Sequence, residues 1–287
     1  MNHNESGRVT LLKERLKGPY TQDDPLVLEW IREGGILQKP SISSYNLDNP
    51  DEDPSEGQAQ IVKKLFSNKT GGFFVECGAW DGETRSNTLS LERDLQWQGL
   101  LIEADADNFE ILLSKRRKAW ASQSCLSVHP YPHDARFFGN YSTGRVVFDS
   151  GRKNLRAKMF PLEKAVEHIQ CFPLFSFLLA LNRTEVDYLS LDVEGSEEDV
   201  IQTIPFHLVS IKVLSIELTH GLYGRKTSEF LKVYMKQRGY KFVTRVISDY
   251  SMANDLIFAH KDFQYSAQFP DELFYLNKTL MNIYGKQ

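Results

Sequence analysis

The stretch Gly72-Phe73-Phe74-Val75-Glu76-Cys77-Gly78-Ala79-Trp80-Asp81-Gly82 decides the fold. An apolar run ends in the acid Glu76, and Gly78 and Gly82 bracket a turn before a helix-like segment. This order predicts the first strand-turn-helix unit of a nucleotide-binding sheet, because glycine lets the backbone approach a ligand without a Cβ in the way. A strand-helix turn that binds no ligand is the alternative interpretation.

The spacing E-x-G-x-x-x-G distinguishes this turn from two related motifs. A dinucleotide fingerprint has the spacing G-x-G-x-x-G, and a phosphate loop ends in Gly-Lys-Ser/Thr. An acid beside the turn suits ribose hydroxyls or a positive amine better than a pyrophosphate. The motif therefore favours a cofactor such as S-adenosylmethionine (SAM). Ser86 and Asn87 follow the turn, where their side chains either cap a helix or meet the cofactor.

A second unit follows at the expected distance. Residues 99–102 are apolar and end in Glu103, about 20 residues past the glycine turn. In doubly wound sheets an acid at this place hydrogen-bonds the ribose hydroxyls. A solvated acid at a helix start is the alternative for Glu103, although Asp105 and Asp107 fill that position more naturally.

Two later strands end in polar residues. Residues 186–191 are followed by Asp192-Val193-Glu194, and because carboxyl ends of parallel strands face one crevice, Asp192 and Glu194 are expected near Glu76 and Glu103. His220 follows the strand predicted over residues 209–218. A histidine there is either a general base acting on a hydroxyl or a hydrogen-bonded surface residue.

Other acids near these strand ends receive simpler interpretations. Glu197, Glu198 and Asp199 are expected to complement a helix dipole and are not counted as site residues. A divalent ion held by Asp192, Asn254 and Asp255 is a further alternative. Such groups are common at strand ends without a metal, so no metal is predicted.

Composition bounds the class of protein. The chain has 287 residues, 41% of them hydrophobic, which is ample for a sizeable core. A net charge of -4 offers no global attraction to nucleic acid or to an anionic membrane, so no nucleic-acid partner is predicted. The only dense basic run, residues 115–118, is expected to be a solvated helix end. No stretch of about eighteen apolar residues predicts a membrane span, and the first thirty residues lack the core of a signal peptide.

Cysteines and glycosylation sequons bear on the compartment. Cys77, Cys125 and Cys171 have neither metal-ligand spacing nor a C-x-x-C pair, so no structural zinc site is predicted, and their odd number leaves at least one thiol free. Five N-x-S/T sequons, more than chance supplies, are typical of a lumenal or extracellular chain; they begin at Asn4, Asn68, Asn140, Asn182 and Asn277. In an oxidising compartment a Cys125–Cys171 bridge becomes possible. A cytoplasmic chain remains the alternative.

The remaining organisation is read from composition and periodicity. Residues 1–56 are expected to form an N-terminal arm, with a short amphipathic helix over residues 25–33 and a linker over residues 41–56. Residues 57–287 are expected to form the main α/β domain. Residues 240–246 and 256–260 are expected to be a closing pair of strands, and residues 271–284 a final helix.

Three segments together resemble the FkbM-type methyltransferase domain, particularly its metazoan, Star-like branch. They are FFVECGAWDGETRSNTLSLE (73–92), GLLIEADADNFEILLSKRRKAW (99–120) and VDYLSLDVEGSEEDVIQTIPF (186–206). The resemblance covers about residues 57–262 and implies a Rossmann-like, seven-stranded SAM-dependent methyltransferase fold. It also implies O-methylation of a hydroxyl on a small molecule or glycan. By motif, the resemblance implies that SAM is bound by Glu76, Gly78, Ala79, Asp81, Gly82, Glu103 and Ala104. It also implies that the base that removes the hydroxyl proton is Asp192, Glu194 or His220.

The Star-like relatives imply a rival function. They resemble this domain yet act in moving secretory cargo proteins early in the secretory pathway, anchored by a membrane segment ahead of the domain. No such segment precedes the domain here, so a soluble relative or a lumenal domain is expected. A SAM pocket can persist in a protein that binds without catalysing.

Overall fold

The strand predicted before the glycine turn lies at the centre of a large sheet. The structure is a computed structural model that describes residues 11–138, 145–147, 166–218, 222–248, 254–276 and 279–281. In these ranges a nine-stranded sheet has the order β13-β12-β10-β11-β9-β8-β1-β2-β3. Its strands are β1 (Phe73–Cys77), β2 (Gln98–Glu103), β3 (Trp120–Gln123), β8 (Glu185–Leu191), β9 (Ser210–Glu217), β10 (Tyr240–Ser248), β11 (Asn254–His260), β12 (Glu272–Leu276) and β13 (Thr279–Met281).

Most central strands of this sheet are parallel. β1 pairs in parallel with both β2 and β8, and β8 pairs in parallel with β9. β11 is antiparallel to both of its neighbours, β9 and β10. The carboxyl ends of β1, β2, β8 and β9 therefore meet at one edge together with the start of β11, and we call this the carboxyl edge.

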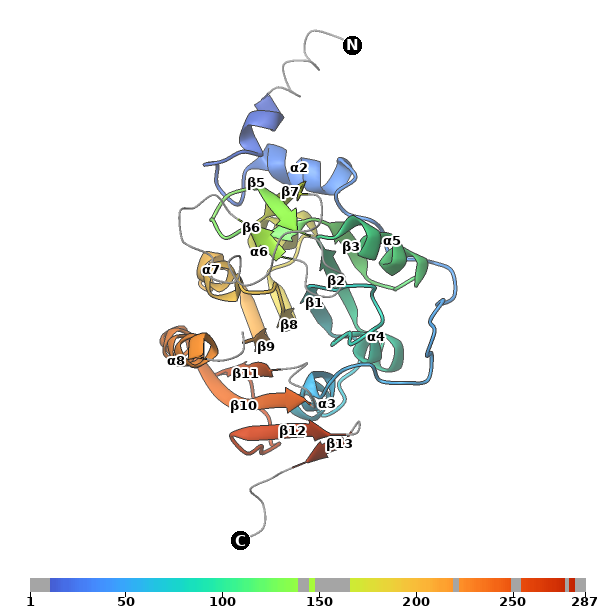
Figure 1. Cartoon of the computed structure of the whole chain (residues 1–287), viewed down its shortest axis with the longest axis vertical. Coiled ribbons are helices and arrows are strands. Elements are labelled where there is room, and N and C mark those ends of the chain that lie inside the picture. Colours follow the sequence, from blue (N-terminus) through green and yellow to red (C-terminus); the bar gives the residue numbers. More distant parts are fainter. Residues whose placement is uncertain are drawn as a thin grey trace.

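Helices cover both faces of the large sheet (Figure 1). One face packs against α2 (Pro25–Glu33), α6 (Leu174–Ala180), α7 (Glu197–Thr203) and α8 (Leu222–Gln237). The other packs against α3 (Gln58–Leu65), α4 (Leu89–Leu95) and α5 (Ala106–Ser114). β1 serves both faces because its side chains alternate, with Phe73 and Val75 in one core and Phe74 in the other. The predicted α/β architecture is thus confirmed.

The end of the chain differs from its prediction. The described part of residues 271–284 forms β12 and β13, where a helix was expected. Leu273 and Tyr275 are buried while Glu272 and Phe274 are partly exposed, a period of two that suits a strand. β12 pairs with β10, so these residues extend the sheet and bury one face.

A smaller sheet carries the disulfide. Its strands, in the order β4-β7-β5-β6, are β4 (Cys125–Leu126), β7 (Val166–Phe172), β5 (His133–Phe138) and β6 (Arg145–Val147). Cys125 and Cys171 face each other in the β4–β7 pairing and form a disulfide, so the bridge considered from sequence is present. Cys77 is a buried thiol outside any disulfide.

The N-terminal segment is packed onto the main body. Asp24 caps α2 by accepting a hydrogen bond from the Leu26 backbone N–H at 2.9 Å. Val27 and Ile31 on this helix are fully buried in the same core as α6. Arg32 Nε donates to the Ala180 carbonyl at 2.9 Å. The division of the chain at residue 56 stays a prediction, but α2 shares the core of the larger unit.

The segment that follows α2 runs along β3, the last strand of the large sheet. Gln38 pairs with Ala121 in an antiparallel bridge. Farther along, the Ser41 N–H donates to the Arg117 carbonyl and the Asn46 N–H to the Lys115 carbonyl, each at 3.0 Å. These bonds fix the segment to the chain that enters β3.

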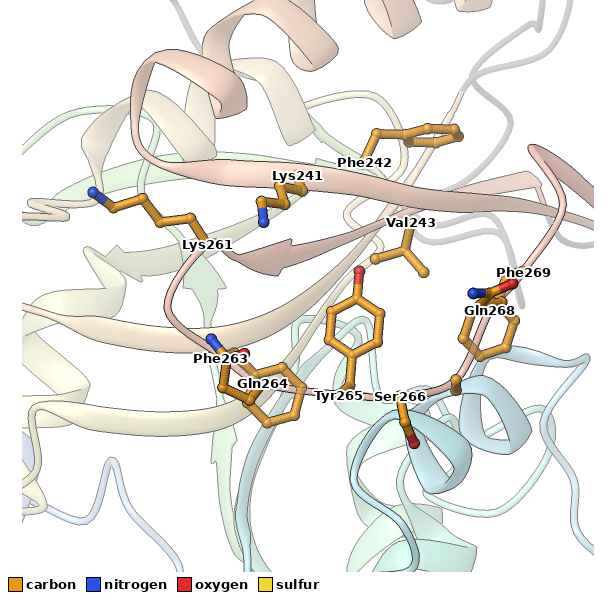
Figure 2. Close-up of a pocket in the computed structure, with 11 residues that line it drawn as sticks. Lys241, Phe242, Val243, Lys261, Phe263, Gln264, Tyr265, Ser266, Gln268 and Phe269 are labelled. Atoms are coloured by element: carbon orange, nitrogen blue, oxygen red, sulfur yellow. The ribbon is translucent and has the colours of Figure 1, made fainter.

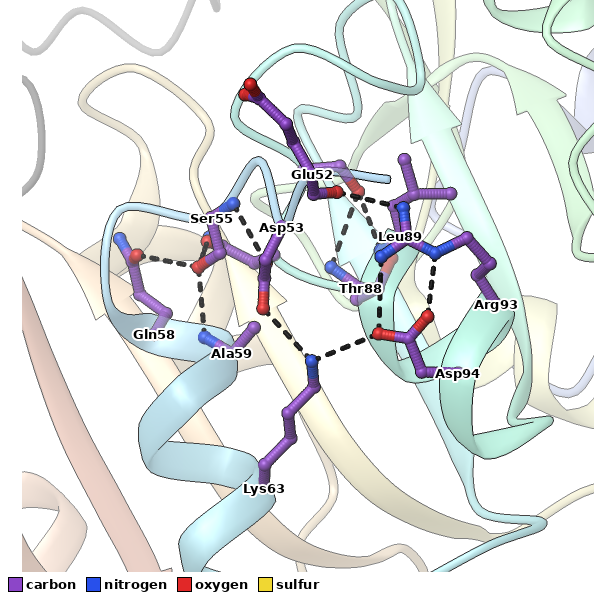
Figure 3. A network of polar contacts seen from close by, with 12 residues as sticks. Glu52, Asp53, Ser55, Gln58, Ala59, Lys63, Thr88, Leu89, Arg93 and Asp94 are labelled. Atoms are coloured by element: carbon purple, nitrogen blue, oxygen red, sulfur yellow. Dashed lines mark hydrogen bonds and ion pairs between the residues drawn. The ribbon is translucent and has the colours of Figure 1, made fainter. Parts of the chain in front are cut away.

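A network of polar contacts holds the start of α3 against α4 (Figure 3). Ser55 Oγ accepts a hydrogen bond from the Ala59 N–H at 2.9 Å, and Lys63 Nζ lies 3.0 Å from Asp53 and 3.4 Å from Asp94. Arg93 donates to the Glu52 carbonyl at 2.8 Å. The linker predicted over residues 41–56 is therefore held by specific contacts at this end.

The basic run 115–118 was predicted to be solvated, and this is wrong for two of its members. Lys115 and Arg117 are 5% and 3% exposed. Lys115 Nζ lies 2.8 Å from Glu83, and Arg117 Nε lies 3.1 Å from Glu92. Buried acids on α4 and in the loop before it provide the partners that the local sequence does not reveal. Within the described ranges, no helix is both long and apolar enough to cross a membrane.

Candidate functional site

The glycine turn brings two strand ends into contact at the carboxyl edge. Gly78 has φ +78°, and a Cβ at this position would stand closer than 3.0 Å to the Asp192 carbonyl oxygen. Gly82 has φ +77°, and a Cβ there would lie 2.9 Å from Leu112 Cγ. Only glycine meets both demands without strain. Gly78 itself is exposed, so the turn offers bare backbone at this edge.

Glu76 points into the protein beneath this turn. Its carboxylate accepts hydrogen bonds from Ser86 Oγ at 2.8 Å, the Asn87 N–H at 2.6 Å and Thr88 Oγ1 at 2.5 Å. Burial raises the pKa of Glu76, while the nearby Arg117 opposes that rise. The described contacts make Glu76 an anchor for the start of α4, and its predicted contact with the cofactor stays a prediction.

Ser86 and Asn87 are also engaged within the protein. Ser86 Oγ accepts from the Leu89 N–H at 3.1 Å, which supports the capping interpretation. Asn87 Nδ2 donates to Ser190 Oγ at 3.0 Å, and its Oδ1 accepts from Ser55 Oγ at 3.0 Å. Both residues are buried, so they shape the turn from below.

The other residues of the turn have mixed surroundings. Asp81 is partly exposed and accepts hydrogen bonds from the Glu83 and Thr84 backbone N–H groups at 2.8 and 2.7 Å. Ala79 is 2% exposed and belongs to the core beneath α4 and α5. Ala104 is partly buried against the smaller sheet. A cofactor role for each of these three residues stays a prediction.

Glu103 lies at the end of β2, beside the glycine turn. Its carboxylate accepts from the Trp80 N–H at 2.7 Å and from the Asp105 N–H at 2.8 Å. Burial raises the pKa of Glu103 to about 7. The Ala104 backbone N–H also donates to this carboxylate, and two carboxylate oxygens offer about four lone-pair sites, so acceptor capacity is left for one more donor. Glu103 is thus an acceptor at the place where a ribose-binding acid is expected.

Asp192 is the most unusual acid of the carboxyl edge. It follows β8, and its Oδ1 is buried without a hydrogen-bond partner. Its carboxyl group hydrogen-bonds Glu217, which ends β9. Burial and the charges of Glu194 and Glu197 raise the pKa of Asp192 well above its usual range. A carboxyl group in this state binds a proton or a cation strongly.

Two residues that sequence reasoning left out of the site lie beside Asp192. One carboxylate oxygen each from Asp192, Glu197 and Glu217 lies within 4.8 Å of the others. Glu197 was expected to be a helix-dipole charge, but it is 3% exposed, and its Oε1 accepts from the Val193 and Gly195 N–H groups at 2.9 and 3.0 Å. The end of a predicted strand was the signal that pointed to Glu217 and was not used, whereas only the folded loop brings Glu197 inward.

The remaining residues predicted for the site, or considered as metal ligands, differ in how the structure places them. Glu194 has φ +54°, a left-handed conformation in the loop after β8, and its charge acts on Asp192. His220 lies outside the described residues. Asn254 and Asp255 lie at the start of β11, and Asp255 is paired in register with Glu217. Gln58 Nε2 donates to Asp255 at 2.8 Å, and burial raises the pKa of Asp255 to about 6.

A hollow of about 490 Å³ opens elsewhere (Figure 2). It is lined by the start of β10, Lys261 and residues 263–269. The start of β10 pairs with the end of β11, as Tyr240 does with His260, so this hollow lies at the edge opposite to the glycine turn. It is separate from the acids described above.

The fold indicates the class of protein, and a family model identifies the family. The sheet order and the glycine turn at the carboxyl edge are those of a Rossmann-like methyltransferase fold, as predicted. The family model of the methyltransferase FkbM domain matches residues 76–242, more than half of the chain. The chain therefore belongs to the FkbM methyltransferase family, and this family membership supports SAM as the methyl donor.

Solved methyltransferase structures show low similarity to this chain. Methyltransferase FkbM from Methylobacillus flagellatus is 13% identical with a TM-score of 0.41, over 90% of this chain and 59% of that one. The METTL16 methyltransferase domain is 13% identical with a TM-score of 0.42, over 83% and 79%. The human methyltransferase 10 domain containing protein is 10% identical with a TM-score of 0.40, over 82% and 95%. No curated protein matches the chain significantly.

Proposed function

We propose that this protein transfers the methyl group of SAM to a hydroxyl oxygen of a small molecule or glycan. The observation that carries the proposal is the pairing of an exposed Gly78 turn with the acid Glu103 on the neighbouring strand, in a chain of the FkbM family. SAM supplies an activated methyl group and carries a positive charge, which suits an edge rich in carboxylates.

The residues present fit such a cofactor. The backbone at Gly78 has no side chain in the way, and the Glu103 carboxylate has acceptor capacity left for a ribose hydroxyl. The buried Oδ1 of Asp192 lacks a partner, which indicates that this edge is built for a bound group. Gly78, Gly82 and Glu103 are thus the positions we assign to cofactor binding, with Glu76, Ser86 and Asn87 holding the turn from below.

Methylation of a hydroxyl requires alignment and the removal of one proton. Alignment contributes much of the rate in such transfers, because reacting atoms are held at attack distance. Asp192 and Glu194 are our candidates for the proton acceptor. Burial raises the pKa of Asp192, and a carboxylate with a raised pKa is a stronger base than an exposed one, while Glu194 lies in the same loop and its charge acts on Asp192. His220 is the third candidate from sequence.

Calorimetric titration of the full chain with SAM and S-adenosylhomocysteine tests the cofactor step. We expect micromolar binding that Glu103→Ala weakens at least about tenfold, the effect of losing one good hydrogen bond to a charged group. Glu110→Ala is the matched control, because Glu110 is an exposed acid on α5. Absence of binding at millimolar ligand would refute the enzyme proposal and favour the Star-like binding role with a secretory cargo protein.

The acceptor atom needs a separate test. Incubation with isotope-labelled SAM and a panel of hydroxyl and amine compounds, analysed by mass spectrometry, distinguishes O-methylation from N-methylation. Labelled methyl ethers are the expected products. Label found on nitrogen alone would contradict the hydroxyl assignment while leaving the methyltransferase class intact.

We also propose that the domain works in the lumen of the secretory pathway. The Cys125–Cys171 disulfide suits an oxidising compartment, and the sequon residues Asn68 and Asn182 are exposed. Enzymatic removal of N-glycans from protein made in a secreting cell is expected to lower its apparent mass. Unchanged mass together with reduced Cys125 would contradict the lumenal assignment.

A further inference from the structure

We infer that Asp192, Glu197 and Glu217 form a binding site for one divalent cation of the Mg²⁺, Mn²⁺ or Ca²⁺ type. The three side chains come from the loop after β8, the first turn of α7 and the end of β9. They meet at the carboxyl edge, against the glycine turn. This site goes beyond methyl transfer, because its occupancy can be measured without SAM.

The spacing of the oxygens fits one ion. One ligand oxygen from each residue lies within 4.8 Å of the other two. Oxygen ligands stand about 2.0–2.6 Å from Mg²⁺ or Ca²⁺, so two ligands on opposite sides of one ion are about 4–5 Å apart. The carboxylates therefore need little movement to share a cation. Hard oxygen ligands without cysteine or histidine select these ions over zinc or copper.

A second observation points to a ligand at this place. Asp192 Oδ1 is buried and has no hydrogen-bond partner, although the rest of this carboxyl group is bonded to Glu217. Buried carboxylate oxygens are almost always paired, because leaving one unpaired costs its full desolvation. A cation bound by Asp192 would supply the missing partner.

The surrounding charges also call for a cation. Glu194 and Asp255 add to the negative potential at Asp192 and Glu217. In the described part of the chain, no Lys or Arg forms an ion pair with Asp192, Glu197 or Glu217. A proton shared between Asp192 and Glu217 offsets part of the repulsion when no ion is bound. A divalent ion neutralises more of the charge.

Glu197 is held in place before any ion binds. The Val193 and Gly195 backbone N–H groups donate to its carboxylate at 2.9–3.1 Å. By contrast, the amide of Asn254 is already engaged on both sides, since its Nδ2 donates to the Leu218 carbonyl and its Oδ1 accepts from Arg245. The sequence predicted no metal and offered Asp192 with Asn254 and Asp255 only as an alternative ligand set, and we propose instead a set of Asp192, Glu197 and Glu217.

A bound cation would also determine which acid acts as a metal ligand and which accepts the proton. Asp192 would then act as a ligand, so the proton acceptor in the proposed methyl transfer would be Glu194 or His220. The cation would lie where a substrate hydroxyl oxygen could approach it at the same edge. This consequence rests on the proposed function, whereas the cation site itself does not.

Binding of Mn²⁺ to the full chain, followed by electron paramagnetic resonance of the free ion, tests the site directly. We expect one ion per chain, displaced by excess Mg²⁺ or Ca²⁺. Asp192→Asn and Glu217→Gln should each weaken Mn²⁺ binding at least about tenfold, because each replaces a charged ligand. Glu198→Gln is the matched control, since Glu198 neighbours Glu197 on α7 but lies outside the cluster. It should bind Mn²⁺ like the wild type.

Thermal unfolding shows that the variants are folded. Without divalent ions, Asp192→Asn should melt at or above the wild-type temperature, because it removes a charge from a repulsive group. At about a hundredfold excess of ion over its Kd, the wild type should gain on the order of 5 °C and Asp192→Asn almost nothing. Lack of Mn²⁺ binding at millimolar concentration, or equal binding by all three variants, would overturn the site. Cation binding without SAM binding would refute only the proposed function.

Discussion

Replacing Gly78 by alanine tests how the carboxyl edge is built. Two costs add at this position. A left-handed φ of +78° costs a non-glycine residue about 1–2 kcal/mol. The new Cβ would also stand closer than 3.0 Å to the Asp192 carbonyl oxygen and 3.1 Å from its carbonyl carbon, and backbone atoms cannot rotate away. Forcing such a group into a packed site costs about 1–3 kcal/mol more.

Gly71→Ala is the matched control for this experiment. Gly71 has φ +69°, and a Cβ there would meet no atom within 4 Å, so this variant bears only the backbone cost. Urea unfolding followed by circular dichroism should place Gly78→Ala about 1–3 kcal/mol below Gly71→Ala in free energy of unfolding. Gly78→Ala should also lose SAM binding, since the Asp192 N–H, which donates to the Cys77 carbonyl at 3.2 Å, must move away from it. Equal stability of the two variants within about 0.5 kcal/mol would refute the reasoning.

Three further changes probe the buried charges and the disulfide. Because the pKa of Glu103 is raised to about 7, the folded state holds this proton more tightly than the unfolded chain, and stability falls as pH rises from about 4.5 to about 7. Between about pH 5 and about pH 8, the free energy of unfolding should fall by about 2 kcal/mol more for the wild type than for Glu103→Gln, as measured by urea unfolding at each pH. Parallel pH profiles of the two proteins would contradict this. Arg117→Met leaves Glu92 and Glu76 buried without their cation and should lower the free energy of unfolding by about 3–5 kcal/mol in the same assay. A decrease below about 1 kcal/mol would show that the Arg117–Glu92 ion pair contributes little to stability. Cys125→Ser opens a loop of 46 residues and should lower the free energy of unfolding by about 3–4 kcal/mol under non-reducing conditions; an identical melting temperature with and without reductant in the wild type would contradict a stabilising bridge.

Local patterns were sufficient to predict the centre of the fold. The apolar runs before Glu76, Glu103 and Asp192 are β1, β2 and β8, because buried parallel strands are continuous apolar segments bounded by turns. The crossover rules of α/β sheets reduce the possible strand orders to a few, and the structure shows which one is adopted. The C-terminal strands were mistaken for a helix, because a short apolar run lacks a decisive period.

The surroundings of the candidate site could not be predicted in the same way. Glu76 and Glu103 stand where sequence placed them, yet nothing near them in the chain indicates that Thr88 and Trp80 are their partners. Lys115 and Glu197 carry charges that a local pattern assigns to solvent. Lys115 is buried because Glu83, many residues away, pairs with it, and Glu197 is buried because the loop before α7 turns back onto its carboxylate. A local sequence pattern shows neither the distant partner nor the path of the loop.

The segment that runs from Gln38 to Asn46 has a consequence for anyone who shortens this chain. A strand at the border of a sheet exposes unpaired amide and carbonyl groups, which invite other chains to add to it and aggregate. Gln38, hydrogen-bonded to Ala121, shields that border here. Truncation to residues 57–287 would uncover β3, leave the Lys115 ammonium without Asp48 and strip α2 from α6. Expression of the FkbM domain alone should therefore begin before residue 24.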